Sequence, residues 1–316
     1  MNVLFLFLDG VGLGLDDPLR NPFARAEMPN LQNLLAGNKL LATTAPFEGK
    51  RATLLALDAR LSVDGRPQSA TGQAAILTGK NAPALLGYHY GPKPNPEVIH
   101  LVKNGNLFSA LHKAGKTAVL LNAYPPQYFE NIQNGRRLPG VLSLAASSAG
   151  LKLKTLQDLI HGTALSVDFT GHGWRDYLGI SETPLLDPTE AGQRLGCLTQ
   201  EYDFTCFEFW PSDVAGHRQD MTNAIHMLAQ FDQVLGGLLP TLDEDNGLII
   251  LTSDHGNVED LSHRHHTYNP VPLLLIGSVY HRQRMTPQLK DLTDIAPAIL
   301  ELFSLTHTEG HLHDQT

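Results

Sequence analysis

Three hydrophobic runs along the chain are each followed, within three residues, by an aspartate. The runs and their acids are residues 3–8 with Asp9, residues 204–210 with Asp213, and residues 248–251 with Asp254. Short apolar runs that stop at polar residues are typical of strands buried in a sheet. Ligands of open α/β sheets bind at the carboxyl ends of the strands, so we expect the three acids to meet at one rim.

Further patterns predict the remaining elements. Additional strands are expected at 52–61, 117–121 and 271–276, and helices at 28–35, from Ser69 onward, 106–114, 221–239 and 292–303. Residues 81–97 are rich in Pro, Gly and Tyr, which predicts a long loop. Strands that alternate with helical segments predict an α/β protein whose mainly parallel sheet is sandwiched by helices.

Between residues 123 and 196 the pattern changes to short helical pieces and polar runs. We interpret this segment as a small inserted cap, or substrate region, on a core formed by residues 1–122 and 197–316. Arg136, Arg137 and Arg175 are the cap's candidate anion-binding residues, because guanidinium groups suit phosphate oxygens. The alternative for each is a solvent-exposed loop arginine.

Composition narrows the class of protein. The chain has 316 residues, 42% of them hydrophobic and 17% charged, and a formal charge of −9, which argues against nonspecific nucleic-acid binding. Only two cysteines are present, too few for a disulfide scaffold or a cysteine zinc cage. No apolar run approaches the roughly 18 residues of a bilayer span, so we expect a cytoplasmic protein without membrane contact.

The acids at the strand ends are accompanied by histidines. Three carboxylates and three imidazoles are expected to converge: Asp9, Asp213, His217, Asp254, His255 and one histidine from 263–266. Oxygen and imidazole ligands in this mixture suit two divalent ions such as zinc or manganese. Single acids or histidines at strand ends are often structural, but six from four segments are hard to explain in that way.

Ser69 is the candidate nucleophile beside these groups. It precedes a run of small and apolar residues that predicts a helix, whose free N–H groups and dipole would favour an anion such as a phosphoryl group. The alternative is a serine that only caps the helix. Thr71 is a second hydroxyl that competes for the same role.

The combination of motifs resembles the alkaline phosphatase superfamily, in the branch that contains cofactor-independent phosphoglycerate mutase and phosphopentomutase. The blocks that carry the resemblance occur in the family's order: Leu8-Asp9-Gly10, Met28-Pro-Asn-Leu31, Ser69-Ala-Thr-Gly-Gln-Ala-Ala-Ile-Leu-Thr-Gly79, Asp213-Val-Ala-Gly-His217, Ser253-Asp-His-Gly-Asn257, His266-Thr-Tyr-Asn-Pro-Val-Pro272 and Asp294-Ile-Ala-Pro297. They cover roughly two-thirds of the chain and imply an alkaline phosphatase-like core.

The resemblance also implies roles for individual residues. One metal ion would be surrounded by Asp9, Ser69, Asp254 and His255, and the other held by Asp213, His217 and His266. The serine block selects Ser69 over Thr71, because Gly72 and Gly79 stand where the family has them. The His-Thr-x-Asn-x-Val-Pro pattern selects His266, which leaves His263 and His265 as candidates for outer-shell or substrate contacts.

This chain departs from the phosphoglycerate mutase pattern in two ways. Gly72-Gln73 stands where that pattern has Gly-His, and the inserted region is much shorter than the mutase's phosphotransferase domain. Both departures weigh against phosphoglycerate mutation and leave the metal chemistry intact. Gln73, and Asn122 at the end of the strand predicted at 117–121, are further candidate substrate contacts.

We therefore expect a two-metal enzyme that transfers the phosphoryl group of a small phosphate ester through a phosphoserine, with a phosphomonoesterase favoured. A phosphomutase or a phosphodiesterase of the same superfamily is the alternative. A sulfatase would need a Cys/Ser-x-Pro-x-Arg setting, which the Ser69 block lacks. A metal-binding protein without turnover is the alternative from another class.

Overall fold

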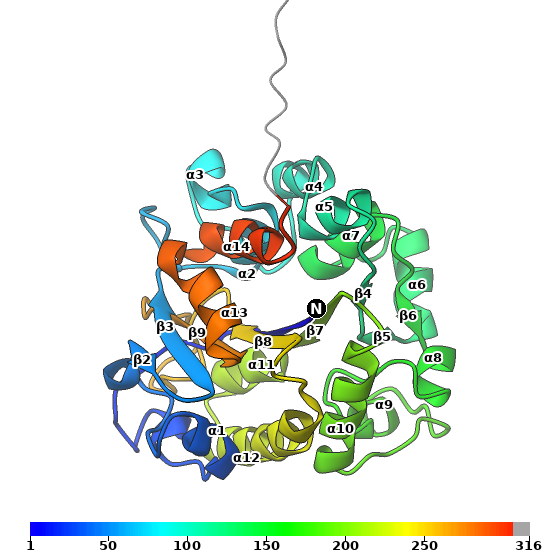
Figure 1. Ribbon diagram of the computed structural model, residues 1–316. Helices are drawn as coiled ribbons and strands as arrows, with labels where there is room; N and C mark the ends of the chain where they lie inside the picture. Colours follow the sequence, from blue (N-terminus) through cyan, green and yellow to red (C-terminus); the bar gives the residue numbers. More distant parts are fainter. Residues whose placement is uncertain (306–316) are drawn as a thin grey trace, which may run out of the picture.

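A seven-stranded sheet forms the centre of the molecule, seen in a computed structural model that describes residues 1–305 (Figure 1). In spatial order its strands are β2 (Phe47–Glu48), β3 (Ala52–Leu57), β9 (Val271–Gly277), β8 (Gly247–Thr252), β1 (Asn2–Leu8), β7 (Phe204–Phe209) and β4 (Ala118–Leu120). The strand β1 pairs in parallel with both β7 and β8, so the ends that precede Asp9, Asp213 and Asp254 lie at one rim.

The expected α/β class is confirmed, with a sheet that is mixed rather than wholly parallel. The strand β9 runs antiparallel to both of its neighbours, β8 and β3, and β2 runs antiparallel to β3. Parallel neighbours need a crossover, usually a helix, but residues 253–270 between β8 and β9 contain none. The chain therefore turns back along β8, and the turning segment stays at the rim.

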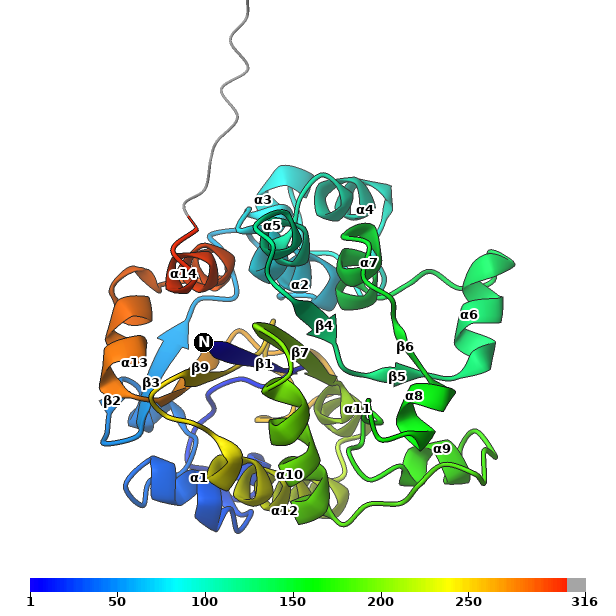
Figure 2. The ribbon, with the colours of Figure 1, turned by 45° about the vertical axis from the view of Figure 1, so that its right-hand side comes forward.

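Side chains of β1 alternate between two hydrophobic clusters, one on each face of the sheet. Val3, Phe5 and Phe7 belong to one cluster, and the leucines between them belong to the other. The first face is covered mainly by α2 (Ser69–Thr78), α4 (Pro96–Lys103), α5 (Leu107–Lys113), α7 (Val141–Ser148), α13 (Val279–Met285) and α14 (Ile295–Leu302), and the second by α1 (Pro29–Leu34), α10 (Pro188–Thr199) and α12 (Met221–Leu238) (Figures 1 and 2). This is the helix–sheet–helix sandwich that the hydrophobic pattern predicts.

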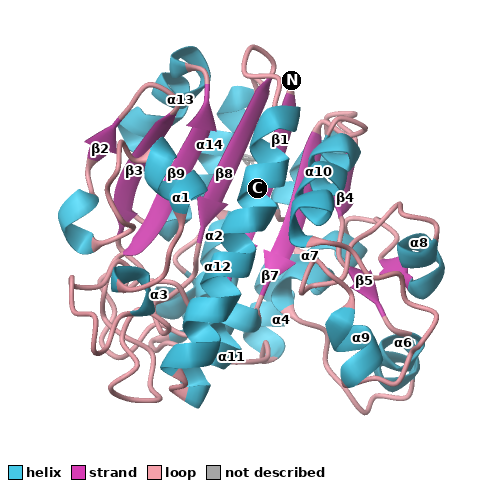
Figure 3. Ribbon diagram, turned by 90° about the horizontal axis from the view of Figure 1, so that it is seen from below, coloured by secondary structure: helices cyan, strands magenta, loops and turns pink. Residues whose placement is uncertain are grey.

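A smaller unit lies beside β4 and β7. Its elements are β5 (Ala123–Tyr124), α6 (Pro126–Gln133), β6 (Lys154–Thr155), α8 (Leu156–Ile160) and α9 (His172–Asp176) (Figure 3). Ala123, Leu159, Ala164 and Trp174 form its own small apolar cluster. Within residues 123–196, however, α7 and α10 pack on the two faces of the main sheet. The division into core and cap stays a proposal, in which we now place α7 and α10 with the core.

Two expected boundaries are wrong. Residues 81–97 are not one long loop, because α3 (Ala82–Leu86) forms there and α4 begins at Pro96. Each of these helices has a proline in its first turn, where the missing N–H is harmless, and an asparagine cap before it. The strand expected at 52–61 ends at Leu57.

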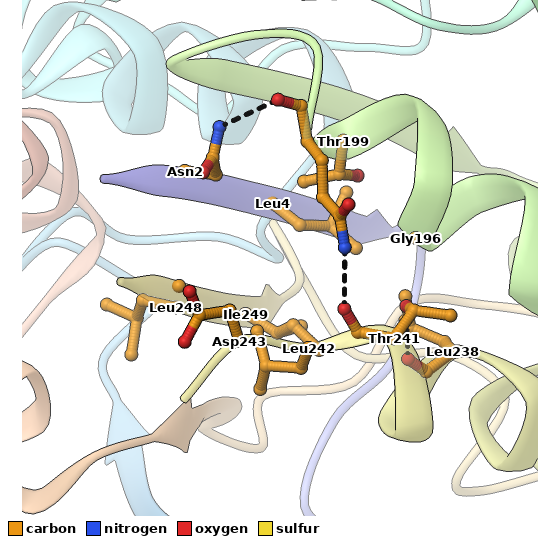
Figure 4. Close-up of a pocket in the computed structure, with 12 residues that line it drawn as sticks. Asn2, Leu4, Gly196, Thr199, Leu238, Thr241, Leu242, Asp243, Leu248 and Ile249 are labelled. Atoms are coloured by element: carbon orange, nitrogen blue, oxygen red, sulfur yellow. Dashed lines mark hydrogen bonds between the residues drawn. The ribbon is translucent and has the colours of Figure 1, made fainter. Parts of the chain in front are cut away.

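The opposite end of the sheet carries a small apolar pocket, lined in part by Leu4, Leu238 and Leu242 (Figure 4). Its volume of about 30 Å³ suits one or two water molecules rather than a metabolite. Gln200 closes it by donating from Nε2 to the carbonyl oxygen of Thr241 at 2.8 Å.

Among residues 1–305, no helix is both long and apolar enough to span a bilayer.

Candidate metal centre

The acids expected at the sheet rim lie on three neighbouring connections. Asp9 follows β1 directly, and Asp254 and His255 follow β8 within three residues. Asp213 lies in the first turn of α11 (Pro211–Arg218), which begins two residues after β7. Since β1 lies between β7 and β8, these side chains converge on one place.

His255 is the centre of the first group of side chains. Its Nε2 lies 3.3 Å from Oδ1 of Asp9, 3.7 Å from Oδ2 of Asp254 and 3.0 Å from Oγ of Ser69. All four residues are buried. The structure therefore brings together the set that the resemblance assigns to one metal ion.

Asp213 is the centre of the second group. Its Oδ2 lies 3.2 Å from Nε2 of His217, and its Oδ1 lies 3.6 Å from Nε2 of His266. The Nδ1 of His217 is 2.8 Å from the carbonyl oxygen of Arg264, and that of His266 is 2.8 Å from the carbonyl oxygen of Pro67. A carbonyl oxygen can only accept, so both Nδ1 atoms carry the hydrogen in these bonds.

The two imidazoles therefore direct their Nε2 atoms at each other, 3.4 Å apart, beside the Asp213 carboxylate. Neutral rings with Nδ1 protonated would place two lone pairs face to face, which a shared cation relieves. Histidines that bind metals commonly donate their other ring N–H to a backbone carbonyl in this manner. The donor set fits a divalent ion without rearrangement of the rings.

The two groups of side chains adjoin each other. Ligand atoms of Asp9, Asp213 and His255 lie within 4.8 Å of one another, and the rings of His255 and His266 stack with centroids 3.7 Å apart. Six of the seven expected metal ligands are carboxylates or imidazoles in this one cluster, and Ser69 is the seventh. The convergence expected from four chain segments is present.

The pKa values of the clustered side chains indicate a repulsion between buried carboxylates, which a bound cation would relieve. Burial, and then the charge of Asp254, raise the pKa of Asp9 to about 7, and Oδ1 of Asp9 is buried without a hydrogen-bond partner. Burial alone would lower the pKa of His255, but Asp254 and Asp9 raise it to about 10. Burial and the charge of His255 lower the pKa of His266 to about 4. Buried carboxylates that repel one another in this way are the expected surroundings of a bound metal ion.

Two glycines permit the close approach of these segments. Gly10 has φ +70°, and a β-carbon there would lie 2.7 Å from Oδ1 of Asp213. A β-carbon on Gly72 would lie 2.8 Å from the carbonyl oxygen of Asp254. Both positions therefore exclude larger residues because of what the site brings alongside them.

Ser69 is the first residue of α2 and not its cap. Gln68 occupies the cap position, and the Ser69 hydroxyl lies against His255 instead of against the helix backbone. Thr71, the competing hydroxyl, lies within hydrogen-bond distance of the carbonyl oxygens of Gln68 and Tyr90. The geometry therefore leaves Ser69 as the hydroxyl of the cluster.

Several candidate substrate contacts are engaged elsewhere. Gln73 donates from Nε2 to Oδ2 of Asp254 at 3.1 Å, so it supports a candidate ligand. Asn122 exchanges two hydrogen bonds of 2.8 Å with the main chain of Glu208 and extends the pairing between β4 and β7. Arg175 donates from Nε and Nη2 to the carbonyl oxygen of Thr183. These contacts favour supporting roles for the three residues.

The remaining candidates differ in their surroundings. Arg136 and Arg137 are both exposed after α6, and the Arg137 guanidinium lies 5.2 Å from the ring centroid of Tyr128. His263 lies 2.9 Å through Nδ1 from the carbonyl oxygen of His265, which is itself exposed. Of these four, Arg137 is the one that contacts an aromatic ring of the cap.

Glu259 was not identified from the sequence, although it joins three segments of the site. Its buried carboxylate accepts hydrogen bonds from Gly12 N, Asn257 N, the Thr267 hydroxyl and Nδ2 of Asn269. These donors belong to the segments that carry Asp9, His255 and His266. A Gly-Asn-x-Glu pattern after an Asp-His pair was the only available signal, and it does not reveal that the acid turns inward.

Glu259→Gln is expected to destabilise the protein by about 2–3 kcal/mol, because an amide NH2 would face N–H and O–H donors in a buried place. Metal affinity should fall roughly 10- to 100-fold as the ligand segments loosen. Urea unfolding of the metal-free protein and metal titration against a chelating dye measure the two effects. Glu97→Gln, an exposed residue of α4, is the control. If the Glu259→Gln variant unfolds at the same urea concentration as the wild type, Glu259 does not brace the site.

The fold and the cluster together define an α/β protein with a candidate metal centre at the carboxyl rim of its sheet. Residues 189–307 match the sequence model of the metalloenzyme superfamily, so this part of the chain is similar to that superfamily. The match includes Asp213, His217, Asp254, His255 and His266, whereas Asp9 and Ser69 lie outside it. The resemblance indicated by the motifs is therefore confirmed, and a divalent metal is implied.

Curated relatives agree with this placement. The 2,3-bisphosphoglycerate-independent phosphoglycerate mutase of Desulforudis audaxviator is 32% identical over 112 residues, which cover 34% of this chain and 22% of the relative. The enzyme of the same name from Moorella thermoacetica is 24% identical over 202 residues, covering 58% and 37% respectively. The matched region spans well under half the length of either relative.

A solved structure shows the fold over nearly the whole chain. The PH0037 protein from Pyrococcus horikoshii superimposes with a TM-score of 0.57 at 15% identity, covering 96% of both chains. At that identity the likeness concerns the fold alone.

Proposed function

We propose that this protein is a metal-dependent phosphoryl-transfer enzyme that acts on a small phosphate ester through a phosphoserine at Ser69, most simply as a phosphomonoesterase. The observation that carries the proposal is the geometry of the cluster. Two Nε2 atoms and a carboxylate face one another beside a second group of two acids and an imidazole. A serine hydroxyl lies within hydrogen-bond distance of that imidazole.

Two divalent ions, manganese or zinc, would be held by Asp9, Ser69, Asp254 and His255 on one side and by Asp213, His217 and His266 on the other. When bound, such ions lower the pKa of a coordinated hydroxyl and neutralise charge on phosphoryl oxygens. The backbone N–H groups in the first turn of α2, which begins at Ser69, favour the same anion. The metal ions and the start of α2 would thus both bind the phosphoryl group at the same position, beside Ser69.

The chain's own residues then carry out a two-step transfer. Ser69 loses its hydroxyl proton to solvent, and its Oγ forms a bond to phosphorus while the ester P–O bond breaks. The bond electrons leave with the alcohol oxygen, which takes up a proton. Water attacks the phosphoserine in a phosphatase, and a substrate hydroxyl attacks it in a mutase. Burial of Ser69 limits access of water before the substrate binds.

A phosphomutase is the second candidate, because the curated relatives carry the name phosphoglycerate mutase. The absence of an imidazole at Gln73 and the small size of the cap favour the phosphatase. A metal-binding protein without turnover would have no use for a serine that contacts His255 instead of capping its helix.

Loading the protein with Mn²⁺ or Zn²⁺ and supplying p-nitrophenyl phosphate tests the proposal. We expect saturable release of p-nitrophenol, its loss on addition of EDTA, and its recovery when metal is restored. Bis(p-nitrophenyl) phosphate reports a phosphodiesterase, and ³¹P NMR of 3-phosphoglycerate reports a mutase. If two metals are bound and none of the three substrates reacts, the protein is a metal-binding protein and the proposal fails.

A further inference from the structure

Two positively charged side chains, Lys93 and Arg137, lie near the candidate metal centre and belong to neither of its two groups of side chains. Lys93 follows Gly91, and a β-carbon on Gly91 would lie 3.1 Å from the backbone nitrogen of Ser69. A β-carbon on Gly140 would lie 3.9 Å from Nζ of Lys93. The segment before Lys93 therefore passes the start of α2, and the ammonium group of Lys93 lies near the start of α7.

Glu208 of β7 points to the same side of the sheet. It pairs in register with Phe7, which belongs to the cluster on the α2 face, and its neighbours Phe207 and Phe209 belong to the opposite cluster. Asp9 lies two residues beyond Phe7 and so shares that face. Figure 2 shows α7, α6 and the small sheet of β5 and β6 on the β4 side of the main sheet.

Glu208 interacts electrostatically with Lys93 and Arg137. Burial, and then the charge of Asp9, raise the pKa of Glu208 to about 7, while Lys93 and Arg137 act in the opposite direction. Burial of the ammonium end and the charge of Arg137 lower the pKa of Lys93, although the lysine as a whole is exposed. Two cations thus act on one carboxyl, so the group has a net positive charge even when Glu208 is ionised.

Neither cation is neutralised by an ion pair. Lys93 and Arg137 are absent from the ion pairs formed within residues 1–305. The N-terminus of α7, beside Lys93, has Gly140 at its cap position and no side-chain cap, so its dipole adds positive potential. Within residues 1–305, the two cations therefore form no ion pair and the start of α7 has no side-chain cap.

We propose that Lys93, Arg137 and the start of α7 form a subsite for a second anionic group, carried by the alcohol part of the phosphate ester. The preferred substrates are then phosphate esters with a carboxylate or a second phosphate a few bonds from the reacting phosphoryl group. This inference rests on the proposed function, because it takes Ser69 and the metal centre as the place where the first phosphate reacts. Tyr128 orients Arg137 through the contact between ring and guanidinium.

Substrate pairs matched in size test the inference. 3-Phosphoglycerate against glycerol 3-phosphate isolates a carboxylate, and fructose 1,6-bisphosphate against fructose 6-phosphate isolates a phosphate. We expect kcat/KM to be roughly 10- to 100-fold higher for at least one doubly anionic ester than for its partner. Lys93→Gln and Arg137→Gln should each remove most of this preference, mainly through KM. Turnover of p-nitrophenyl phosphate should change by less than about threefold.

Lys103→Gln is the matched control, because it removes the same charge from an exposed residue of α4. Calorimetric binding of 3-phosphoglycerate and fructose 1,6-bisphosphate to metal-loaded Ser69→Ala protein gives a second readout that does not require turnover. The subsite is overturned if the wild type shows no preference, if Lys103→Gln loses as much as Lys93→Gln, or if p-nitrophenyl phosphate is affected equally. Activity on p-nitrophenyl phosphate alone would leave the proposed function standing while the subsite fails.

Discussion

Ser69→Ala is expected to lower the kcat for a phosphate monoester roughly 10⁴-fold or more, because it removes the hydroxyl that lies against His255 and would accept the phosphoryl group. The Ser69 Oγ lies 3.0 Å from Nε2 of His255, and the hydroxyl of Thr71 is bound to backbone carbonyl oxygens. Rapid acid quenching with ³²P-labelled substrate should label the wild type on serine and leave Ser69→Ala unlabelled. Metal analysis of the same samples reports whether the ions stay bound without the hydroxyl.

Thr71→Val is the matched control, since it removes the competing hydroxyl from the same helix. It should keep the phosphoserine and most of the turnover, with a modest loss of stability from the hydrogen bonds around Tyr90. Labelling that persists in Ser69→Ala would assign the nucleophile to another residue. Equal losses in the two variants would point to a disturbed helix instead of a missing nucleophile.

Asp254→Ala is expected to abolish activity and to lower the metal content of the protein. The carboxylate is fully buried against His255, so its removal leaves the ion of this group under-coordinated. Elemental analysis after dialysis should find fewer than two ions per chain. Asp245→Ala, at an exposed position between α12 and β8, should retain both ions and full activity.

Stability without metal distinguishes a ligand from a structural acid at this position. The charge of Asp254 raises the pKa of Asp9, so the two carboxylates repel each other when no cation is present. Asp254→Ala removes this repulsion together with the attraction to His255, so it should cost the metal-loaded protein more stability than the metal-free protein. Two ions still bound per chain in the variant, or an equal loss of stability with and without metal, would count against the assignment as a ligand.

The sequence by itself determined which elements form and which residues end them. The alternating faces of β1 and the apolar runs of β7 and β8 are local patterns, because burial on both faces demands unbroken hydrophobicity. Asp9, Asp213 and Asp254 follow these runs so closely that parallel pairing alone brings them to one rim. The block around Ser69 and the pattern at His266 could also be recognised from the sequence, because the residues of each are contiguous in the chain.

Only the tertiary structure decided how separate segments orient the side chains between them. The reversal of β9 depends on a connection without a helix, and the protonation of His217 and His266 at Nδ1 depends on carbonyl oxygens 47 and 199 residues away. Glu259 and Lys93 carry no local signal, because an acid or a base acquires its function from what packs against it, and the sequence suggested Arg137 only as one of three candidate arginines. Hydrogen bonds and charges act through space, so the chain's order alone does not specify them.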